Sequence, residues 1–149
     1  MQAELLEGVS EQTRQRILEA AHDESFAKGD FMFRLGEPAR HFYILGEGRV
    51  RLTLGQGERL AYVASSPSEL IGWSSLVDNE SYTASAECLA PVKVLRIEKA
   101  QLDEVLSRDR ASGMAFYKNL AAIIGLRLIK SYQATLSVHG NREAKGIAN

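Results

Sequence analysis

Residues 70–84 combine a glycine, hydroxyl side chains and a short helical segment in a pattern that could bind an anion. Gly72 has no Cβ, so the backbone there can approach a ligand closely. The segment that follows is long enough for one helical turn, and its opening amides at Ser74 and Ser75 would be unpaired and able to hold an anion. A returning strand begins near Thr83, whose hydroxyl adds another donor. The pattern predicts a phosphate cradle.

Other kinds of site chemistry find little support in the residue pattern. His22, His41 and His139 are scattered without ligand spacing, so we expect neither a metal nor a haem site. The serines lack His and Asp partners at a known motif spacing, and we therefore expect no catalytic residue and no enzyme activity. The single cysteine, Cys88, lies in an alternating strand pattern and is predicted to be a small buried thiol. We expect no cofactor.

Composition limits the possible partners and the compartment. The chain has 149 residues, 45% hydrophobic and 25% charged, which are values of one globular domain. A net charge of -1 provides no electrostatic footprint for DNA or an anionic membrane. The N-terminus lacks a signal pattern, and no apolar run approaches the length of a membrane span. We expect a cytoplasmic protein with no contact to a membrane.

The elements that must position the cradle are read from hydrophobic periodicity. A helix is predicted over residues 9–21, with Ser10 as its N-cap. From residue 25 to 97 the period is two, which predicts a β-roll of short strands separated by glycine turns. Residues 99–136 read as two helices, a short one followed by a long one, and 137–149 read as a frayed polar tail. The predicted fold is mainly β with flanking α, one domain over residues 1–149.

Residues 69–86 resemble the phosphate-binding cassette of cyclic nucleotide-binding domains, as in bacterial regulators of the catabolite-activator type. That cassette usually reads Gly-Glu, a short helix, then Arg-Ser/Thr-Ala. The frame is kept at Gly72, Thr83 and Ala84, whereas Trp73 replaces the ribose-binding glutamate and Tyr82 replaces the phosphate-binding arginine. Ser68 stands where the family often has glycine. The resemblance implies a double-stranded β-helix, or jelly roll, with an N-terminal helix and a long C-terminal helix.

The resemblance also implies where a ligand would lie. It assigns pocket-wall positions and a lid on the long helix: Val50, Leu52, Tyr62 and Val63 for the wall, Arg127 and Leu128 for the lid. Arg127 could swing into the pocket and supply the missing positive charge, but a solvated arginine on the helix face is the favoured interpretation. Loss of the charged contacts should cost about 2–5 kcal/mol, so cyclic AMP binding would be weak or lost.

Trp73 and Tyr82 allow three interpretations. The two rings could form a changed pocket with neutral N–H and O–H donors, they could fill an empty ligand site, or they could cap the edge of the core. The first is favoured over the second, and the second over the third.

Two functions follow from the resemblance. The first is a small-molecule sensor, for a weakly held cyclic nucleotide or another ligand, in which ligand binding repacks the C-terminal helices and an unknown partner protein reads the change. The alternative is a ligand-free protein-interaction module. In both, the long helix is apolar on more than one side, so we expect it to form a homodimer. The winged helix-turn-helix of many relatives needs further residues, and we expect no DNA-binding module in this chain.

Overall fold

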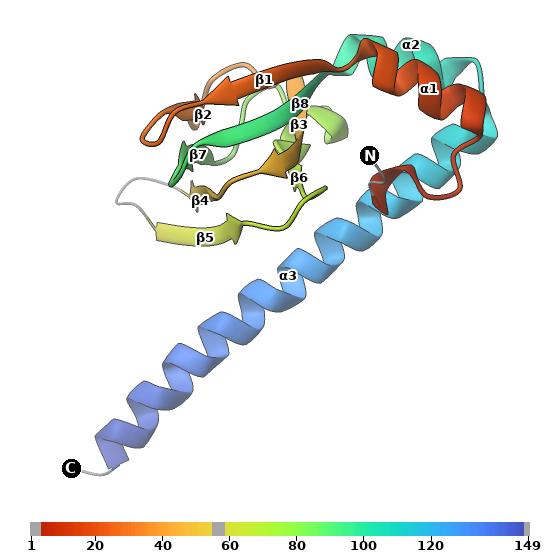
Figure 1. Ribbon diagram of the computed structural model, residues 1–149. Coiled ribbons are helices and arrows are strands. Elements are labelled where there is room, and N and C mark those ends of the chain that lie inside the picture. Colours follow the sequence, from red (N-terminus) through yellow and green to blue (C-terminus); the bar gives the residue numbers. More distant parts are fainter. Residues whose placement is uncertain (1–3, 55–58, 148–149) are drawn as a thin grey trace.

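The computed structural model describes residues 4–54 and 59–147, and it folds most of the chain into two antiparallel sheets beside a group of helices (Figure 1). The first sheet has the strand order β1-β8-β3-β6 and the second has the order β2-β7-β4-β5. The first sheet contains β1 (His22–Phe26), β8 (Val92–Glu98), β3 (His41–Glu47) and β6 (Leu70–Ile71). The second contains β2 (Phe31–Phe33), β7 (Ser85–Cys88), β4 (Val50–Leu54) and β5 (Arg59–Ala64).

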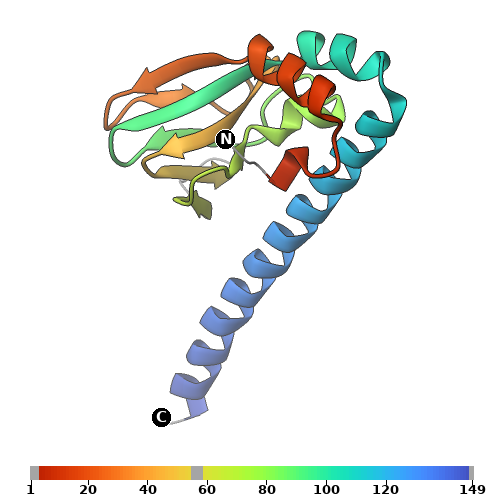
Figure 2. The same ribbon diagram turned by 45° about the vertical axis from the view of Figure 1, so that its right-hand side comes forward.

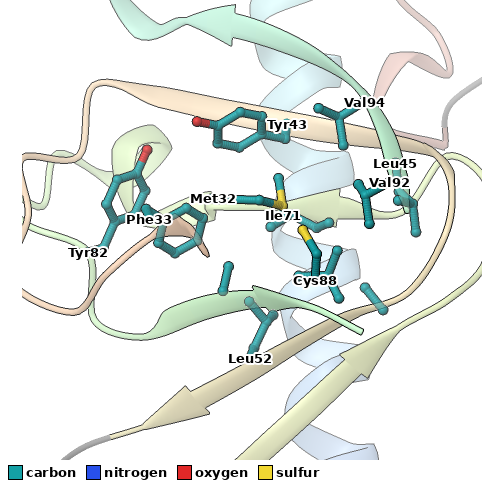
Figure 3. Packing of buried hydrophobic residues seen from close by; sticks show 13 residues of the cluster. Met32, Phe33, Tyr43, Leu45, Leu52, Ile71, Tyr82, Cys88, Val92 and Val94 are labelled. Atoms are coloured by element: carbon teal, nitrogen blue, oxygen red, sulfur yellow. The ribbon is translucent and has the colours of Figure 1, made fainter. Parts of the chain in front are cut away.

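Alternating side chains explain why the sheets pack face to face. In β4, Val50 and Leu52 are buried while Arg51 and Thr53 are half-buried on the other face. The inward residues of both sheets form a cluster that we call the roll core (Figure 3). Its buried members are Met32, Phe33, Tyr43, Leu45, Val50, Leu52, Ala64, Ile71, Tyr82, Ala86, Cys88, Val92 and Val94. The predicted β-roll and the buried Cys88 are therefore confirmed.

The helices η1, α1 and α2 and the start of α3 gather at one end of the roll (Figures 1 and 2). They are the 3-10 segment η1 (Glu4–Leu6), α1 (Glu11–Ala20), α2 (Lys99–Ser107) and α3 (Arg110–Ile147), and a second 3-10 segment, η2 (Trp73–Val77), connects β6 to the polar turn before β7. Together with the outer face of β3 they bury a second cluster, the helix core. Its buried members are Leu5, Leu6, Ile17, Phe42, Ile44, Leu70, Leu76, Ile97, Leu102, Leu106, Phe116 and Leu120.

The first helix and the first strand differ slightly from the predicted bounds. Ser10 caps α1 as predicted, since its hydroxyl accepts a hydrogen bond of 3.3 Å from the amide of Thr13. The roll begins at His22 rather than at residue 25, because β1 already pairs with β8 there. β1 lies at the sheet edge and is rich in polar residues, so its first residues lack the alternation that marks a strand.

The end of the long helix is a larger correction. The sequence predicts a helix end near residue 136 and a frayed tail, but α3 continues to Ile147, and only residues 148–149 lie outside the described part. The tail contains glycine but no proline, and glycine weakens a helix without ending it. α3 extends well beyond the roll (Figure 1). Across the described residues, no helix combines the length and apolarity that a membrane crossing requires.

Candidate functional site

The cassette, which we define as residues 72–84, begins with a backbone turn that only glycine adopts easily. Gly72 has φ +83°, in the left-handed region, and lies directly before η2. A Cβ at this position would lie 3.4 Å from the carbonyl oxygen of His41 and 3.4 Å from Cε1 of Tyr82. η2 ends at Asp78, which is also left-handed with φ +59°. The predicted glycine, helical turn and returning strand are all present.

The hydroxyl groups of the cassette bind one another and the backbone. The Ser74 and Thr83 hydroxyl oxygens lie 3.1 Å apart. The Ser75 hydroxyl donates a hydrogen bond of 3.2 Å to the carbonyl oxygen of Gly72. Ser74 and Ser75 are buried, Thr83 is exposed and Ala84 is half-buried. The structure thus brings the predicted cassette residues together, with their hydroxyls already in contact.

Tyr82, at the position of the family's arginine, lies inside the roll. Its side chain is only 5% exposed, and its ring stacks on Phe33 with 3.8 Å between centroids and 16° between planes (Figure 3). The phenol donates a hydrogen bond of 2.6 Å to the carbonyl oxygen of His41. Burial raises the pKa of Tyr82 to about 12, so the phenol stays neutral. The ring is part of the roll core.

Trp73 and Tyr82 pack in different clusters. Trp73 is half-buried and packs against the helix core, whereas Tyr82 belongs to the roll core. The two rings therefore do not share one pocket. This arrangement favours the interpretation in which Tyr82 fills the ligand site and Trp73 caps the edge of the core. It argues against a pocket lined by both rings.

The predicted wall residues divide between the interior and the rim. Val50 and Leu52 are buried in the roll core. Tyr62 and Val63 are half-buried on β5, and Tyr62 packs against the roll core. The Tyr62 hydroxyl donates to Oε1 of Glu69. Val50 and Leu52 are thus part of the packed core, and the Tyr62 hydroxyl is already bound to Glu69.

Arg127 corrects the sequence interpretation. The expected solvated arginine is instead half-buried against the roll: its guanidinium carbon lies 4.9 Å from the Tyr62 ring centroid and Nη2 donates to the carbonyl oxygen of Leu70. Its spacing from buried Phe116 and Leu120 is a signal that could have placed it on the roll-facing side. Leu128, the other predicted lid residue, is 54% exposed and is absent from both cores.

Glu69 is a candidate site residue that the sequence did not single out. One of its carboxylate oxygens accepts from the Tyr62 hydroxyl, and the other accepts from the amides of Ser65 and Ser66 at 2.8 Å each. Burial opposes the charge, but these hydrogen bonds and the nearby Arg127 outweigh it and lower the pKa of Glu69. For Arg127, burial is the larger effect and lowers the pKa of the guanidinium, although Tyr62 and Glu69 act to raise it.

A pocket of about 390 Å³ lies beside this cluster, between the chain leading into β6 and α3. Tyr62 and residues 66–70 form one wall, and Ile123, Leu126, Arg127 and Lys130 form the other, with Glu4 of η1 also contributing. Ser68 belongs to the first wall and has φ +72°, a left-handed conformation that favours glycine. This is where the family often has glycine.

Lys99, the first residue of α2, connects the cassette to both C-terminal helices. Its ammonium lies 2.8 Å from a carboxylate oxygen of Asp103, 3.0 Å from the hydroxyl of Tyr117 on α3 and 3.8 Å from a carboxylate oxygen of Asp78. Its side chain is only 17% exposed. Although desolvation opposes the charge, the contacts with Asp103 and Tyr117 raise the pKa of Lys99.

Asp109 connects α1 to the junction between α2 and α3. One carboxylate oxygen accepts from the hydroxyls of Ser112 at 2.5 Å, Thr13 at 2.7 Å and Ser10 at 2.8 Å. These hydrogen bonds lower the pKa of Asp109. The junction is therefore fixed by a charged group.

Within the described residues, no three His, Cys, Asp or Glu side chains lie close enough to hold a metal ion.

Comparison with known proteins agrees with the fold. The family model of the cyclic nucleotide-binding domain matches residues 23–109, which is more than half of the chain. The chain therefore belongs to the cyclic nucleotide-binding domain family, a family of regulatory domains, and the resemblance seen in the sequence is confirmed.

Individual relatives agree with this assignment. The chain is 26% identical over 111 residues to the cGMP-dependent protein kinase 2 of Mus musculus. The aligned region is 74% of this chain but only 14% of the kinase. A solved structure from Geobacter metallireducens, grouped with cyclic nucleotide-binding proteins, has a TM-score of 0.74 and 27% identity, covering 83% of this chain and 91% of that one. The N-terminal domain of a transcriptional regulator from Streptomyces coelicolor has a TM-score of 0.70 and 27% identity. The match covers 89% of this chain and 94% of that one.

Proposed function

We propose that this chain is a regulatory sensor domain that no longer binds cyclic nucleotides tightly and that signals through the packing of α2 and α3. The observation that carries the proposal is the position of Tyr82. Where the family has an arginine for the cyclic phosphate, this chain has a neutral ring stacked on Phe33 with its hydroxyl bound to His41. Residues 72–84 contain no Lys, Arg or His, so the cassette itself would offer a cyclic phosphate only neutral donors.

The expected loss of affinity follows from the chemistry of the missing groups. A bidentate guanidinium–phosphate contact is charge-assisted and about twice as strong as a neutral hydrogen bond. Losing it together with the ribose carboxylate contact costs about 2–5 kcal/mol, or roughly a factor of 30 to several thousand in affinity. Displacing Tyr82 would add a further cost, because its stacking and its hydrogen bond would both be lost.

Transmission to the helices is supported by contacts that cross between elements. The Lys99 ammonium contacts the end of η2, α2 and α3, so a shift of η2 changes the surroundings of both helices. Asp109 holds α1 at the α2–α3 junction. A ligand that binds one arrangement more tightly than another shifts the population toward it.

Calorimetric titration with cyclic AMP and cyclic GMP up to millimolar concentration tests the proposal. We expect the natural chain to bind with a Kd above about 10 μM or not at all. The variant carrying Trp73→Glu and Tyr82→Arg should bind at least tenfold more tightly, because it restores the charged side chains that the family has at these two positions. Submicromolar binding by the natural chain would contradict the proposal. The matched control pairs Trp73→Glu with Tyr132→Arg, which adds the same charges but places the arginine at an exposed position on α3.

The second candidate function, a ligand-free dimeric interaction module, is favoured by exposed apolar side chains on α3. Leu126, Leu128, Ile129 and Tyr132 are each more than half exposed. A second copy of α3 would cover such residues, since an apolar helix face is normally buried. Sedimentation equilibrium of the natural chain and of the variant Leu128→Lys plus Tyr132→Lys tests this. The natural chain should be a dimer and the variant a monomer with unchanged circular dichroism.

A further inference from the structure

The pocket between residues 66–70 and α3 lies apart from the cassette. Tyr62, residues 66–70 and four α3 residues line it, together with Glu4, and none of the cassette residues 72–84 is among them. Its volume of about 390 Å³ lies within the range of small-molecule sites. The pocket therefore provides space for a ligand while Tyr82 stays in the roll core.

Two cations lie on the α3 side of this pocket. Arg127 and Lys130 are three residues apart, so they lie on neighbouring positions of the same helix face. Arg127 is fixed by its bond to the Leu70 carbonyl and by the Tyr62 ring. Lys130 is exposed and has no ion-pair partner in the part of the chain that the structure describes. One wall can thus offer two positive charges to an anion.

Glu69 lines the same pocket and has hydrogen-bond partners that do not depend on Arg127. Its carboxylate keeps the Tyr62 hydroxyl and the amides of Ser65 and Ser66 whether or not Arg127 stays close. If a ligand acid group bound Arg127, Glu69 would retain those partners, and Arg127 would retain the carbonyl oxygen of Leu70. A bound acid would therefore leave neither of these half-buried charges without a partner, which would otherwise be costly.

Three other residues of the lining can pack against an apolar ligand body. Pro67, Ile123 and Leu126 provide apolar surface beside the charged groups. Ser68 holds this segment in a left-handed conformation that costs energy for a residue other than glycine. Such backbone strain is concentrated at ligand clamps and switch segments.

We propose that this pocket is the effector site of the domain and that it binds a small organic acid, whose acidic group binds Arg127 and Lys130 and whose apolar part packs on Pro67, Ile123 and Leu126. The proposal rests on the proposed sensor function and names its ligand class. A bound acid would connect residues 66–70 to α3. The ligand would therefore act directly on the helix that carries the signal.

The test is a titration of the isotopically labelled chain, followed by amide chemical shifts, with benzoate as the probe and benzamide as its neutral match. Benzoate should shift the amides of residues 65–70 and 123–130 in a saturable way, and benzamide should bind at least tenfold more weakly. Lys130→Gln removes an exposed charge without altering the core, and it should weaken benzoate binding severalfold. Arg127→Gln should weaken it at least tenfold. Lys118→Gln, on α3 but outside the pocket lining, should leave the affinity unchanged.

Three results would overturn this effector site. They are shifts confined to residues 72–84, equal binding of benzoate and benzamide, or no saturable shift by benzoate. None of these results would by itself contradict the sensor function, which the cyclic nucleotide titration tests separately. Tight cyclic AMP binding by the natural chain would contradict the sensor proposal even if benzoate also bound at Arg127.

Discussion

The phenol oxygen of Tyr82 lies 2.6 Å from the main-chain carbonyl oxygen of His41, and this contact joins the cassette to the start of β3. The neighbouring carbonyl, that of Arg40, accepts from the amide of Lys99 at 2.9 Å. Two adjacent carbonyls of the β3 approach thus connect the cassette on one side and the first residue of α2 on the other. A change at Tyr82 can reach α2 through one short stretch of backbone.

Tyr82→Phe tests this contact. The variant keeps the stacked ring and loses only the hydrogen bond to His41, so the free energy of unfolding should fall by about 0.5–1.5 kcal/mol. Urea denaturation measures the change. Tyr132→Phe removes a hydroxyl from a side chain that is 62% exposed, and it should change stability by less than about 0.5 kcal/mol. Equal effects of the two variants would contradict a role for the His41 contact.

Ser68→Gly should stabilise the protein. Ser68 has φ +72°, and a residue with a Cβ pays about 1 kcal/mol or more in the left-handed region, so glycine should raise the free energy of unfolding by about 0.5–1 kcal/mol. Ser66 lies in the same segment but is not among the residues with positive φ. Ser66→Gly should therefore lower stability by roughly 0.5–1 kcal/mol. If both variants shifted the unfolding midpoint in the same direction, the strain at Ser68 would be refuted.

Asp109→Asn should remove a pH-dependent part of the stability. The hydroxyls of Ser112, Thr13 and Ser10 lower the pKa of Asp109 in the folded chain. A lowered folded-state pKa contributes stability that is fully present above the unfolded value of about 3.9 and is lost as pH falls below it. The natural chain should therefore exceed the variant in stability near pH 7, and the difference should shrink below about pH 4.

Thermal unfolding between pH 3 and 7 measures that difference. Asp23→Asn, at an exposed position on β1, is the matched control and should change stability by less than about 0.5 kcal/mol. A difference between the natural chain and Asp109→Asn that stayed constant across this pH range would argue against the lowered pKa.

Gly48→Ala and Gly125→Ala should have opposite effects. Gly48 has φ +112°, and an added Cβ would lie 2.5 Å from the carbonyl oxygen of Pro91, so the variant should lose about 2–4 kcal/mol. Gly125 lies within α3 with nothing within 4 Å of an added Cβ, so alanine there should gain about 0.5–1 kcal/mol. Chemical denaturation of both variants checks the signs, and a stable Gly48→Ala protein would contradict the close approach to Pro91.

Local signals in the sequence were sufficient for most of the fold. Alternation at Val50 and Leu52 predicted a strand with a buried face, and Ser10 predicted the start of α1. Alternation failed for β1 because an edge strand need not bury every second residue. The end of α3 was misplaced because polar composition does not distinguish a polar helix from a polar loop.

The site was predictable only in part. The cassette frame at Gly72 and Thr83 could be recognised because its residue types and spacing are local. The contacts of Arg127 with Tyr62 and Leu70 could not be predicted, since the partners lie far apart in the chain and meet only when α3 packs on the roll. The hydrogen bond from Tyr82 to His41 is likewise a product of tertiary packing, and residue spacing carries no signal for it.

The length of α3 has a mechanical consequence. Its 38 residues correspond to about 57 Å at the usual helical rise. A rigid rod of that length amplifies rotation at its base: a turn of about 10° near Arg110 would displace the far end by roughly 10 Å. A displacement of α3 beside the roll would therefore be larger at Ile147, where a second macromolecule could detect it without contacting the roll.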